Sequence, residues 1–505
     1  MSAAISAKQA GAQSVVLIDK CPESWAGGNS YFTAGAYRAV HNGLQDVLPL
    51  VNNVSEQQAG RIVLEPYGRN DFAGDLDRVC MGRTDARLAK VLVEESLDAV
   101  RWLASLGVRF DLSFNRQAYE MDGKIKFWGG LCLKTEEGGK SLVRDLQRAA
   151  SQAGVQTLWS TPFRSVKKDA KTGRLNVVVG DASPRLISTG AVIFAAGGFE
   201  ANPRMRAAHL GPGWDMAMVR GTPYNTGECL EYCLRACDAV ATGDWSGCHS
   251  VAWDANADAE SGHREISNEL TKSGYPLGLM VNAHGRRFVD EGEDMRNYTY
   301  AKFGRAILEQ PDHMALQVFD AQATAWLRSE EYRPERVERI TADSIEELAD
   351  KCVARGLRSK DAFVQTILEY NEAVLAHRRE NPSAKWDPST KDGLSTQSTM
   401  KRLGLAKSNW ALALDRAPFL AVKVTAGITF TFGGLKVDPD TAQILPVSGV
   451  SPSRALYCVG EMMGGLFYEN YPGGSGLTAG TVFGRRAGKA AADDEVDHPE
   501  RAGCR

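Results

Sequence analysis

The sequence lacks the features that mark nucleic-acid-binding, secreted and membrane proteins. Its 59 Lys and Arg residues nearly balance 62 Asp and Glu residues, and the net charge of -3 provides no basic surface for a nucleic acid or an anionic membrane. It has no uncharged apolar run of membrane-spanning length and no positively charged start that leads into a secretory signal. We therefore expect a cytoplasmic protein without a membrane span or a nucleic-acid partner.

Paired cysteine motifs are also missing. The 10 cysteines are scattered, and no CxxC pair, CxxCH haem motif or iron–sulfur spacing occurs. Cys229, Cys233 and Cys237 follow one another at i, i+4 and i+8, which fits either a metal site or the buried face of a helix. Because no histidine ligand lies close by, we favour the helix and predict no metal.

The most informative segment present is a glycine-rich stretch near the C-terminus. An apolar run over 455–459 predicts a strand that stops at Gly460 and Glu461, and a glycine-rich loop follows over 464–480. Glycine allows the backbone to approach a ligand closely, and a helix that starts after the loop directs its N–H groups at an anion. The segment predicts a cradle for a large polar cofactor, although similar turns occur in loops that bind nothing.

The N-terminal residues predict a helix, a turn and a strand. The alanine-rich segment 2–10 favours a helix, and 14–19 favours a short buried strand that ends in an acid. In dinucleotide-binding folds an acid in this place bonds the ribose hydroxyls. Asp19 and its neighbour Lys20 are therefore candidate cofactor-binding residues.

A strand and a GxGxxG turn open such a unit in other proteins, and neither precedes the helix at 2–10. Either the chain has lost its first strand or the start of the sequence is placed too late. We expect a Rossmann-like domain with its first strand missing.

Two further predicted turns combine glycine with small or polar residues, and we call them the first and the second corner. An apolar run over 190–195 predicts a buried strand that enters the second corner, and helices are expected over 84–110 and 141–153 with strands over 155–179. The residues of the two corners are Gly27, Gly28, Asn29 and Ser30, then Ala196, Gly197 and Gly198.

The length and the composition predict more than one domain. A chain of 505 residues exceeds what one core holds, and its middle is more polar, with charged helices near 343–380 and a loop over 381–399. We predict an α/β fold. Residues 1–248 and 426–505 are expected to form a Rossmann-like cofactor domain, and 249–425 an inserted α+β capping domain.

Together, Asp19, the two corners, Gly460-Glu461 and the terminal loop resemble the FAD-dependent fumarate reductase/succinate dehydrogenase flavoprotein family. The resemblance covers nearly the whole chain. Within the family, the segments 427–434, 288–300 and 470–474 look most like tricarballylate dehydrogenase. The Tyr-Pro-Gly-Gly loop in the last segment is also similar to that of 3-ketosteroid dehydrogenases.

The resemblance implies that the cofactor is FAD. Asp19 would hold the adenosine ribose, Glu461 would bond ribityl or ribose hydroxyls, and the corner at 27–30 would line the pyrophosphate and the flavin edge. The corner at 196–198 would let a strand end pass close to the cofactor. The residues expected to face the flavin pyrimidine, at the start of the last helix, are Ser475, Gly476 and Leu477.

The resemblance also implies candidate catalytic residues. Arg296 is the closest match to the arginine that transfers the proton, either through an acid such as Glu293 or Asp294 or, alternatively, as a clamp for a substrate carboxylate. His249 falls where fumarate-type members place a substrate-binding histidine. Tyr471 stands where those members carry an arginine, and its hydroxyl would donate to a substrate oxygen.

The segment 429–432, Thr-Phe-Thr-Phe, stands where fumarate-type members carry a second substrate histidine, so it and Tyr471 argue against fumarate reduction. The resemblance implies α,β-dehydrogenation of a polycarboxylate, such as tricarballylate to cis-aconitate, with hydride transfer to flavin N5 and an unidentified electron acceptor. One alternative is a dehydrogenase of a ketosteroid or another bulky enone. Another is a truncated, non-catalytic member that acts as an interaction protein.

Overall fold

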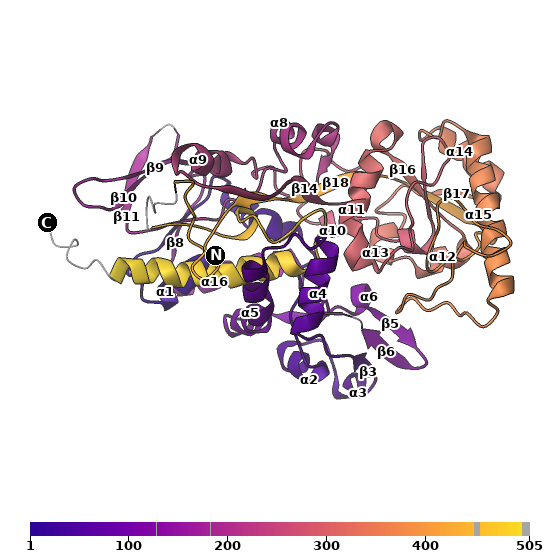
Figure 1. The fold of residues 1–505 in the computed structure, drawn as a ribbon, viewed down its shortest axis with the longest axis horizontal. Helices are drawn as coiled ribbons and strands as arrows, with labels where there is room; N and C mark the ends of the chain where they lie inside the picture. The colour runs from indigo at the N-terminus through magenta and orange to yellow at the C-terminus, as the bar shows by residue number, and fades with distance from the viewer. Residues whose placement is uncertain (128, 182, 449–454, 497–505) are drawn as a thin grey trace. The chain divides into compact units, whose positions relative to one another are not determined.

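The computed structural model describes residues 1–127, 129–181, 183–448 and 455–496 (Figure 1). The described chain forms two compact units. The first comprises Met1–Gly211, Gly221–Cys248 and the chain from Phe430 on, and the second comprises Pro212–Arg220 and His249–Thr429. The roles and limits predicted for the cofactor and capping domains stay a prediction.

The first unit is rich in both helices and short strands. Its α-helices are α1 (Ser2–Gln9), α2 (Leu44–Val47), α3 (Glu56–Ala59), α4 (Arg69–Val79), α5 (Ala86–Ser105), α6 (Phe114–Gln117), α7 (Gly139–Gln152), α8 (Pro203–Met205), α9 (Glu228–Ala236) and α16 (Ser475–Val496). Its strands are β1 (Val16–Ile18), β2 (Ala36–Tyr37), β3 (Ile62–Leu64), β4 (Phe110–Leu112), β5 (Ala118–Met121), β6 (Lys124–Phe127), β7 (Leu133–Thr135), β8 (Gln156–Leu158), β9 (Phe163–Lys168), β10 (Leu175–Val179), β11 (Arg185–Thr189), β12 (Val192–Phe194) and β19 (Leu456–Cys458).

Three parallel strand pairs give the first unit its α/β character, and one of them, β3 with β6, joins segments closer together in the sequence. β1 pairs with β8, and β12 pairs with β19, so segments far apart in the sequence end at common edges. β9, β10 and β11 form an antiparallel sheet. Parallel pairs need crossover connections, which here contain helices of the same unit.

The long helix α16, yellow in Figure 1, packs against the N-terminal helix α1. Glycines make this approach close: a Cβ atom at Gly488 would lie 2.2 Å from the carbonyl oxygen of Ala3. The hydroxyl of Ser6 also donates to the carbonyl of Arg485 at 2.8 Å. The first and last helices of the unit therefore hold each other in place.

The second unit is built on an extended sheet. Two long strands, β14 (Ala241–Asp254) and β18 (Phe419–Leu435), run through the unit boundaries of the chain. The other strands are β13 (Met218–Val219), β15 (Leu279–Asn282), β16 (Ala315–Phe319) and β17 (Ile340–Ala342), and the α-helices are α10 (Ser267–Leu270), α11 (Arg296–Leu308), α12 (Ala321–Trp326), α13 (Ser329–Tyr332), α14 (Ile345–Val353) and α15 (Lys360–Glu380).

β18 organises this sheet. It pairs parallel with β13 and antiparallel with β16 and β17, and β14 also pairs with it. Buried residues of α14 and α15 pack with the sheet in one apolar cluster, and a second cluster joins α11 to β15, β16 and β18. This packing fixes the positions of β15, β16 and β18 in the second unit.

The structure confirms the principal predicted elements. α1, β1, α7, β12, β19 and α16 occupy the predicted segments, and no α-helix or strand is assigned within the described loop 381–399. The helix expected over 84–110 ends earlier, at Ser105, because the chain turns at Gly107 (φ 86°) and enters β4. Cys229 and Cys233 are buried on α9, as the helical interpretation predicted.

Candidate active site

The second corner, at 196–198, and the turn at Gly460 lie at the same edge of a strand pair in the first unit. β12 and β19 are parallel, and the N–H of Val459 donates to the carbonyl of Phe194 at 3.0 Å. Gly197 and Gly460 follow these strands, with φ of 78° and 65°. The carboxyl ends of parallel strands are where open α/β sheets bind ligands.

The surroundings of several glycines indicate whether the first unit has room for FAD. A Cβ atom built on Gly28, Gly460 or Gly480 would meet no atom of the described chain within 4 Å. At Gly476, near the start of α16, the nearest atom is 3.8 Å away, on Phe430. Backbone that borders open space at these positions fits a large cofactor lying against it.

The glycines of the second corner lie close to other protein segments. A Cβ atom on Gly197 would lie 2.4 Å from the side chain of Asn225, and one on Gly198 would lie 2.2 Å from Oε1 of Glu461. The N–H of Ala196 lies 3.3 Å from the sulfur of Met462. This corner therefore packs against other protein segments, which its sequence alone did not indicate.

Glu461 lies at the centre of this packing. Its Oε1 accepts the N–H of Thr431 at 2.7 Å, and its Oε2 lies 3.5 Å from the amide nitrogen of Asn225. Burial raises the pKa of the Glu461 carboxyl, while its hydrogen bonds with Glu200 and Thr431 act in the opposite direction. The two backbone and amide donors favour the charged form of Glu461.

Glu200 was not predicted as a site residue, yet it joins two that were. Its Oε1 accepts from the side-chain amide of Asn29, whose own Oδ1 accepts the N–H of Thr222 at 2.8 Å. Burial, and then the charge of Glu461, raise the pKa of Glu200 well above its ordinary value. We assign the proton of the carboxyl pair to Glu200 and the charge to Glu461.

The remaining predicted residues of the first corner lie in a short 3-10 helix over Gly28–Phe32, preceded by Gly27 with φ of 104°. A Cβ atom on Gly27 would meet Val143, so this glycine packs on α7. The carbonyl of Ser30 accepts the hydroxyl of Thr33 at 2.9 Å. The corner is thus a rigid turn with Asn29 directed at Glu200.

Asp19 follows β1, as predicted, and its Oδ1 accepts the N–H of Cys21 at 3.0 Å. Lys20 points elsewhere: its ammonium group donates to Thr226 at 2.6 Å and forms an ion pair with Glu228. Asp19 is therefore an acidic residue directly after the end of β1. The contacts of Lys20 are with the start of α9.

A buried arginine holds the terminal glycine loop. The Nε of Arg38 donates to the carbonyl of Gly473 at 2.9 Å, and its guanidinium pairs with Asp75 at 3.1 Å. At the end of the loop, Ser475 bonds back to the carbonyl of Pro472 through both its N–H and its hydroxyl. The start of α16, with Gly476 and Leu477, is thereby fixed.

Tyr471 belongs to a cluster of four aromatic rings. Its ring lies edge-on to that of Phe430, with centroids 5.1 Å apart and an interplanar angle of 84°, and it also contacts Phe432 and Phe467. The ring of Tyr471 is mostly buried. This apolar wall in the first unit is suited to a flat or bulky group.

In the second unit, His249 on β14 is buried. Its ring lies edge-on to Tyr300 of α11, at 4.9 Å and 80°. Burial, and then the positive charge of Arg220, lower the pKa of His249 well below its ordinary value. His249 is therefore a neutral imidazole in a positive field.

Arg296 is the first residue of α11 and is half-buried. Burial raises the pKa of the Tyr275 and Tyr332 hydroxyls, and the charge of Arg296 acts in the opposite direction. The acids predicted as its relay contact lysines: Glu293 pairs with Lys302, and Asp294 lies 3.6 Å from Lys391.

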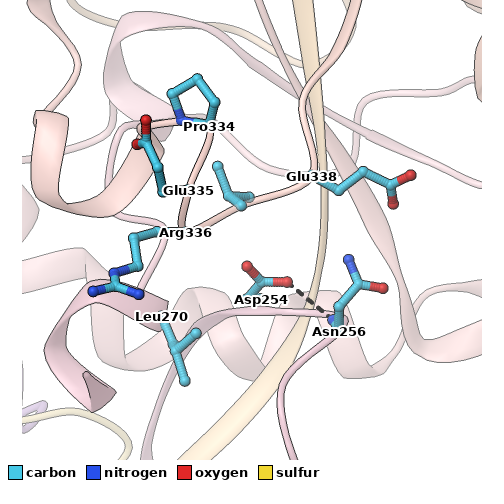
Figure 2. A pocket seen from close by; sticks show the side chains of 8 residues that line it. Asp254, Asn256, Leu270, Pro334, Glu335, Arg336 and Glu338 are labelled. Atoms are coloured by element: carbon cyan, nitrogen blue, oxygen red, sulfur yellow. Dashed lines mark hydrogen bonds between the residues drawn. The ribbon is translucent and has the colours of Figure 1, made fainter. Parts of the chain in front are cut away.

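A cavity of about 340 Å³ also lies in the second unit (Figure 2). Its wall is acidic, with Asp254, Glu335 and Glu338, and Arg336 beside them is bonded to Glu269 at 2.6 Å. None of the eight described residues that line it is a predicted site residue. The cavity is thus distinct from the predicted site.

Sequence reasoning missed Arg38, Glu200 and Arg220. Each stands beside a recognised signal: Arg38 interrupts an apolar stretch, Glu200 follows the second glycine corner, and Arg220 ends the short apolar segment 217–219. A charged residue in an apolar stretch is a usable sign of a buried polar contact. Its partner cannot be read from the sequence, because it lies on a distant segment.

In the described residues, none of the helices has the length and apolar character needed to cross a membrane. Within the same residues, no group of three or more His, Cys, Asp or Glu side chains is arranged to hold a metal ion.

Comparison with known proteins identifies the family. The model of the FAD binding domain family matches residues 1–477. A probable fumarate reductase of Shewanella frigidimarina is 26% identical over 498 residues, covering 98% of this chain and 73% of the relative.

Two solved structures share the fold. The open conformation of a flavocytochrome c3 fumarate reductase has a TM-score of 0.69 at 24% identity, covering 98% of this chain and 76% of that chain. The 3-ketosteroid delta1-dehydrogenase from Sterolibacterium denitrificans has a TM-score of 0.69 at 18% identity, with 97% of each chain covered. The mixed α/β fold and FAD, both predicted from the sequence, are confirmed. This chain belongs to the FAD binding domain family and is an FAD-dependent oxidoreductase.

Proposed function

We propose that this protein catalyses the α,β-dehydrogenation of a polycarboxylate such as tricarballylate, giving cis-aconitate. The observation that carries the proposal is the positive field around the buried His249 in the second unit, where burial, and then the charge of Arg220, lower the pKa of the imidazole. A carboxylate is attracted to such a field, and it would raise the pKa of the imidazole and strengthen its hydrogen bonds. The fumarate reductase among the relatives supports a carboxylate substrate.

In this proposal the first unit binds FAD and the second is the capping domain, with limits near 1–248, 249–425 and 426–505. The first unit supplies Asp19, Glu461 and the start of α16 to the cofactor. Bound FAD supplies the hydride acceptor. An electron acceptor, not yet identified, then regenerates the oxidised enzyme.

The residues of this chain supply the remaining chemistry. Dehydrogenation removes a hydride from one carbon and a proton from its neighbour. Arg296 is proposed to relay that proton to an acid such as Glu293 or Asp294, giving up one guanidinium proton as it takes the proton of the substrate, or to hold a carboxylate while a neighbouring group accepts the proton. His249 is proposed to orient the substrate. Tyr471 is proposed to donate its hydroxyl hydrogen to a substrate oxygen.

A specific observation favours a second candidate. The four rings around Tyr471 form an apolar wall that fits a ring-shaped enone better than a small acid. A structural relative is a ketosteroid dehydrogenase. Dehydrogenation of a cyclic or bulky ketone is therefore the alternative function.

Steady-state assays with an artificial electron acceptor separate the two candidates. Tricarballylate and a saturated 3-ketosteroid are supplied in parallel to the FAD-loaded enzyme, and the products are identified by mass spectrometry. Formation of cis-aconitate without steroid oxidation supports the proposal. Steroid oxidation alone refutes it in favour of the second candidate.

A further inference from the structure

Glu200, two residues after the second corner, is a fully buried carboxyl group of the first unit. The side-chain amide of Asn29 donates to its Oε1. Within the described chain, its Oε2 is buried and accepts no hydrogen bond of ordinary geometry. A buried carboxylate needs donors at both oxygens, whereas a neutral carboxylic acid needs an acceptor for its own proton. The pattern therefore indicates a neutral Glu200 that carries its proton on Oε2.

Glu461 is the acceptor for that proton. The two side chains are hydrogen-bonded to each other, and two carboxyl groups in contact away from water do not both ionise. Glu461 has the donors that a carboxylate needs, because the N–H and the hydroxyl of Thr431 bond to its Oε1 at 2.7 and 3.2 Å. The amide of Asn225 acts on both carboxyl groups, with its nitrogen 3.5 Å from Oε2 of Glu461. The pair thus holds one proton, on Glu200, and one negative charge, on Glu461.

The backbone around Glu461 leaves room for its carboxylate on one side and for a ligand on the other. A Cβ atom at Gly198 would lie 2.2 Å from Oε1 of Glu461 and 2.1 Å from the hydroxyl oxygen of Thr431, so only glycine fits there. Unlike Glu200, Glu461 is only half-buried, and it follows Gly460, beside which the described chain leaves open space. Its carboxylate is therefore held from the protein side, next to the space that fits the cofactor.

We propose that Glu200 is a positioning residue for FAD, which as a neutral acid donates a hydrogen bond to the carboxylate of Glu461 and fixes that carboxylate for the hydroxyl groups of the cofactor. Its bond from Asn29 also joins the first corner to the turn at Gly460, so one buried side chain connects two parts of the cradle. A charged acceptor that is already oriented binds a hydroxyl group most strongly. This role does not depend on which substrate the enzyme oxidises.

The test measures the Kd of FAD in the wild type, Glu200→Leu, Glu461→Gln and the double variant. The holoenzymes are diluted in steps, and the fluorescence of released FAD gives each Kd. Glu200→Gln is added because its amide accepts from Asn29 and donates to Glu461, as the neutral acid does. The matched control is Glu95→Leu, which removes a carboxylate of the same unit that pairs with Arg486 at 2.5 Å. Far-UV circular dichroism verifies the fold of each variant.

We expect Glu200→Leu to weaken FAD binding about 10- to 100-fold, because a hydrogen bond to a charged group is lost. Glu461→Gln should also weaken binding, and in its background Glu200→Leu should cost about threefold or less, because the carboxylate that Glu200 positions is gone. Glu200→Gln should bind FAD within about threefold of the wild type throughout the range from about pH 5 to pH 7. Glu95→Leu should bind FAD like the wild type.

An equal loss from Glu200→Leu in both backgrounds would overturn the role, because Glu200 would then support the fold and not Glu461. Wild-type affinity in Glu200→Leu or in Glu461→Gln would overturn it too, since no carboxylate would then be positioned for the cofactor. The Glu200→Gln comparison tests the proton even if Glu200→Leu does not fold. A ratio of the Glu200→Gln and wild-type Kd values that changes between about pH 5 and pH 7 would show that Glu200 titrates there and is not a neutral acid.

Discussion

The Nε of Arg38 donates to the carbonyl oxygen of Gly473 at 2.9 Å, which ties an N-terminal segment to the glycine loop that precedes α16. Both residues are in the first unit, 435 positions apart in the sequence. Since Arg38 also pairs with Asp75, one buried side chain links the loop to α4. The position of the loop therefore depends on a residue far from it in the sequence.

We predict that Arg38→Met lowers the free energy of unfolding by about 3 kcal/mol, because it leaves Asp75 without its buried cation. The glycine loop should loosen too, so the variant should retain less FAD. Urea unfolding and flavin content measure the two effects. The control, Arg61→Met, removes an exposed pair with Glu120 and should cost about 1 kcal/mol or less. Equal losses in both variants would contradict the anchoring role.

Gly460 and Gly123 offer a matched test of the cofactor cradle. Both have positive φ, 65° and 72°, and no described atom lies within 4 Å of a Cβ built on either. Substitution by alanine should therefore cost each backbone about 1 kcal/mol. We predict that Gly460→Ala loses bound FAD, whereas Gly123→Ala, in the turn between β5 and β6, keeps it. Equal flavin content in the two purified variants would show that the cofactor does not lie against Gly460.

Glu200→Gln should stabilise the protein at high pH. The folded-state pKa of Glu200 is raised above its ordinary value of 4.5, so above that pH the folded protein binds more protons than the unfolded chain, and stability falls as the pH rises. Glutamine keeps the bond from Asn29 and removes the titration. The gain in Tm over the wild type should grow from pH 5 to pH 8. A gain that is absent at pH 8, or larger at pH 5, would contradict a protonated Glu200.

Arg296→Lys distinguishes the two roles proposed for Arg296. If the arginine takes part in proton transfer, kcat for tricarballylate should fall by about 100-fold or more, with little change in KM. A clamp would raise KM instead and leave kcat nearly unchanged. The pH profile of kcat provides a second readout, since a proton-transfer role predicts an altered profile in the variant. Unchanged kcat and KM would remove Arg296 from the mechanism.

The sequence predicted the elements of the first unit well because glycine corners and apolar strands are local signals. The turn at Gly460 and the start of α16 at Ser475 could be predicted because the residues next to them in the sequence determine them. The contacts of Gly198 could not be predicted in the same way, since Thr431 and Glu461 reach it from the far end of the chain. Arg220 was missed for the same reason: its side-chain acceptors lie in two distant segments, 268–271 and Thr429.

Anaerobic titration of the purified protein with tricarballylate, followed by the visible flavin absorbance, tests the central claim most directly. The account predicts a stoichiometric flavin band in the isolated protein that tricarballylate bleaches, with cis-aconitate formed in equal amount. A full flavin band that tricarballylate leaves unchanged would contradict the proposed substrate. A colourless, folded protein would contradict the catalytic account of this chain as a whole.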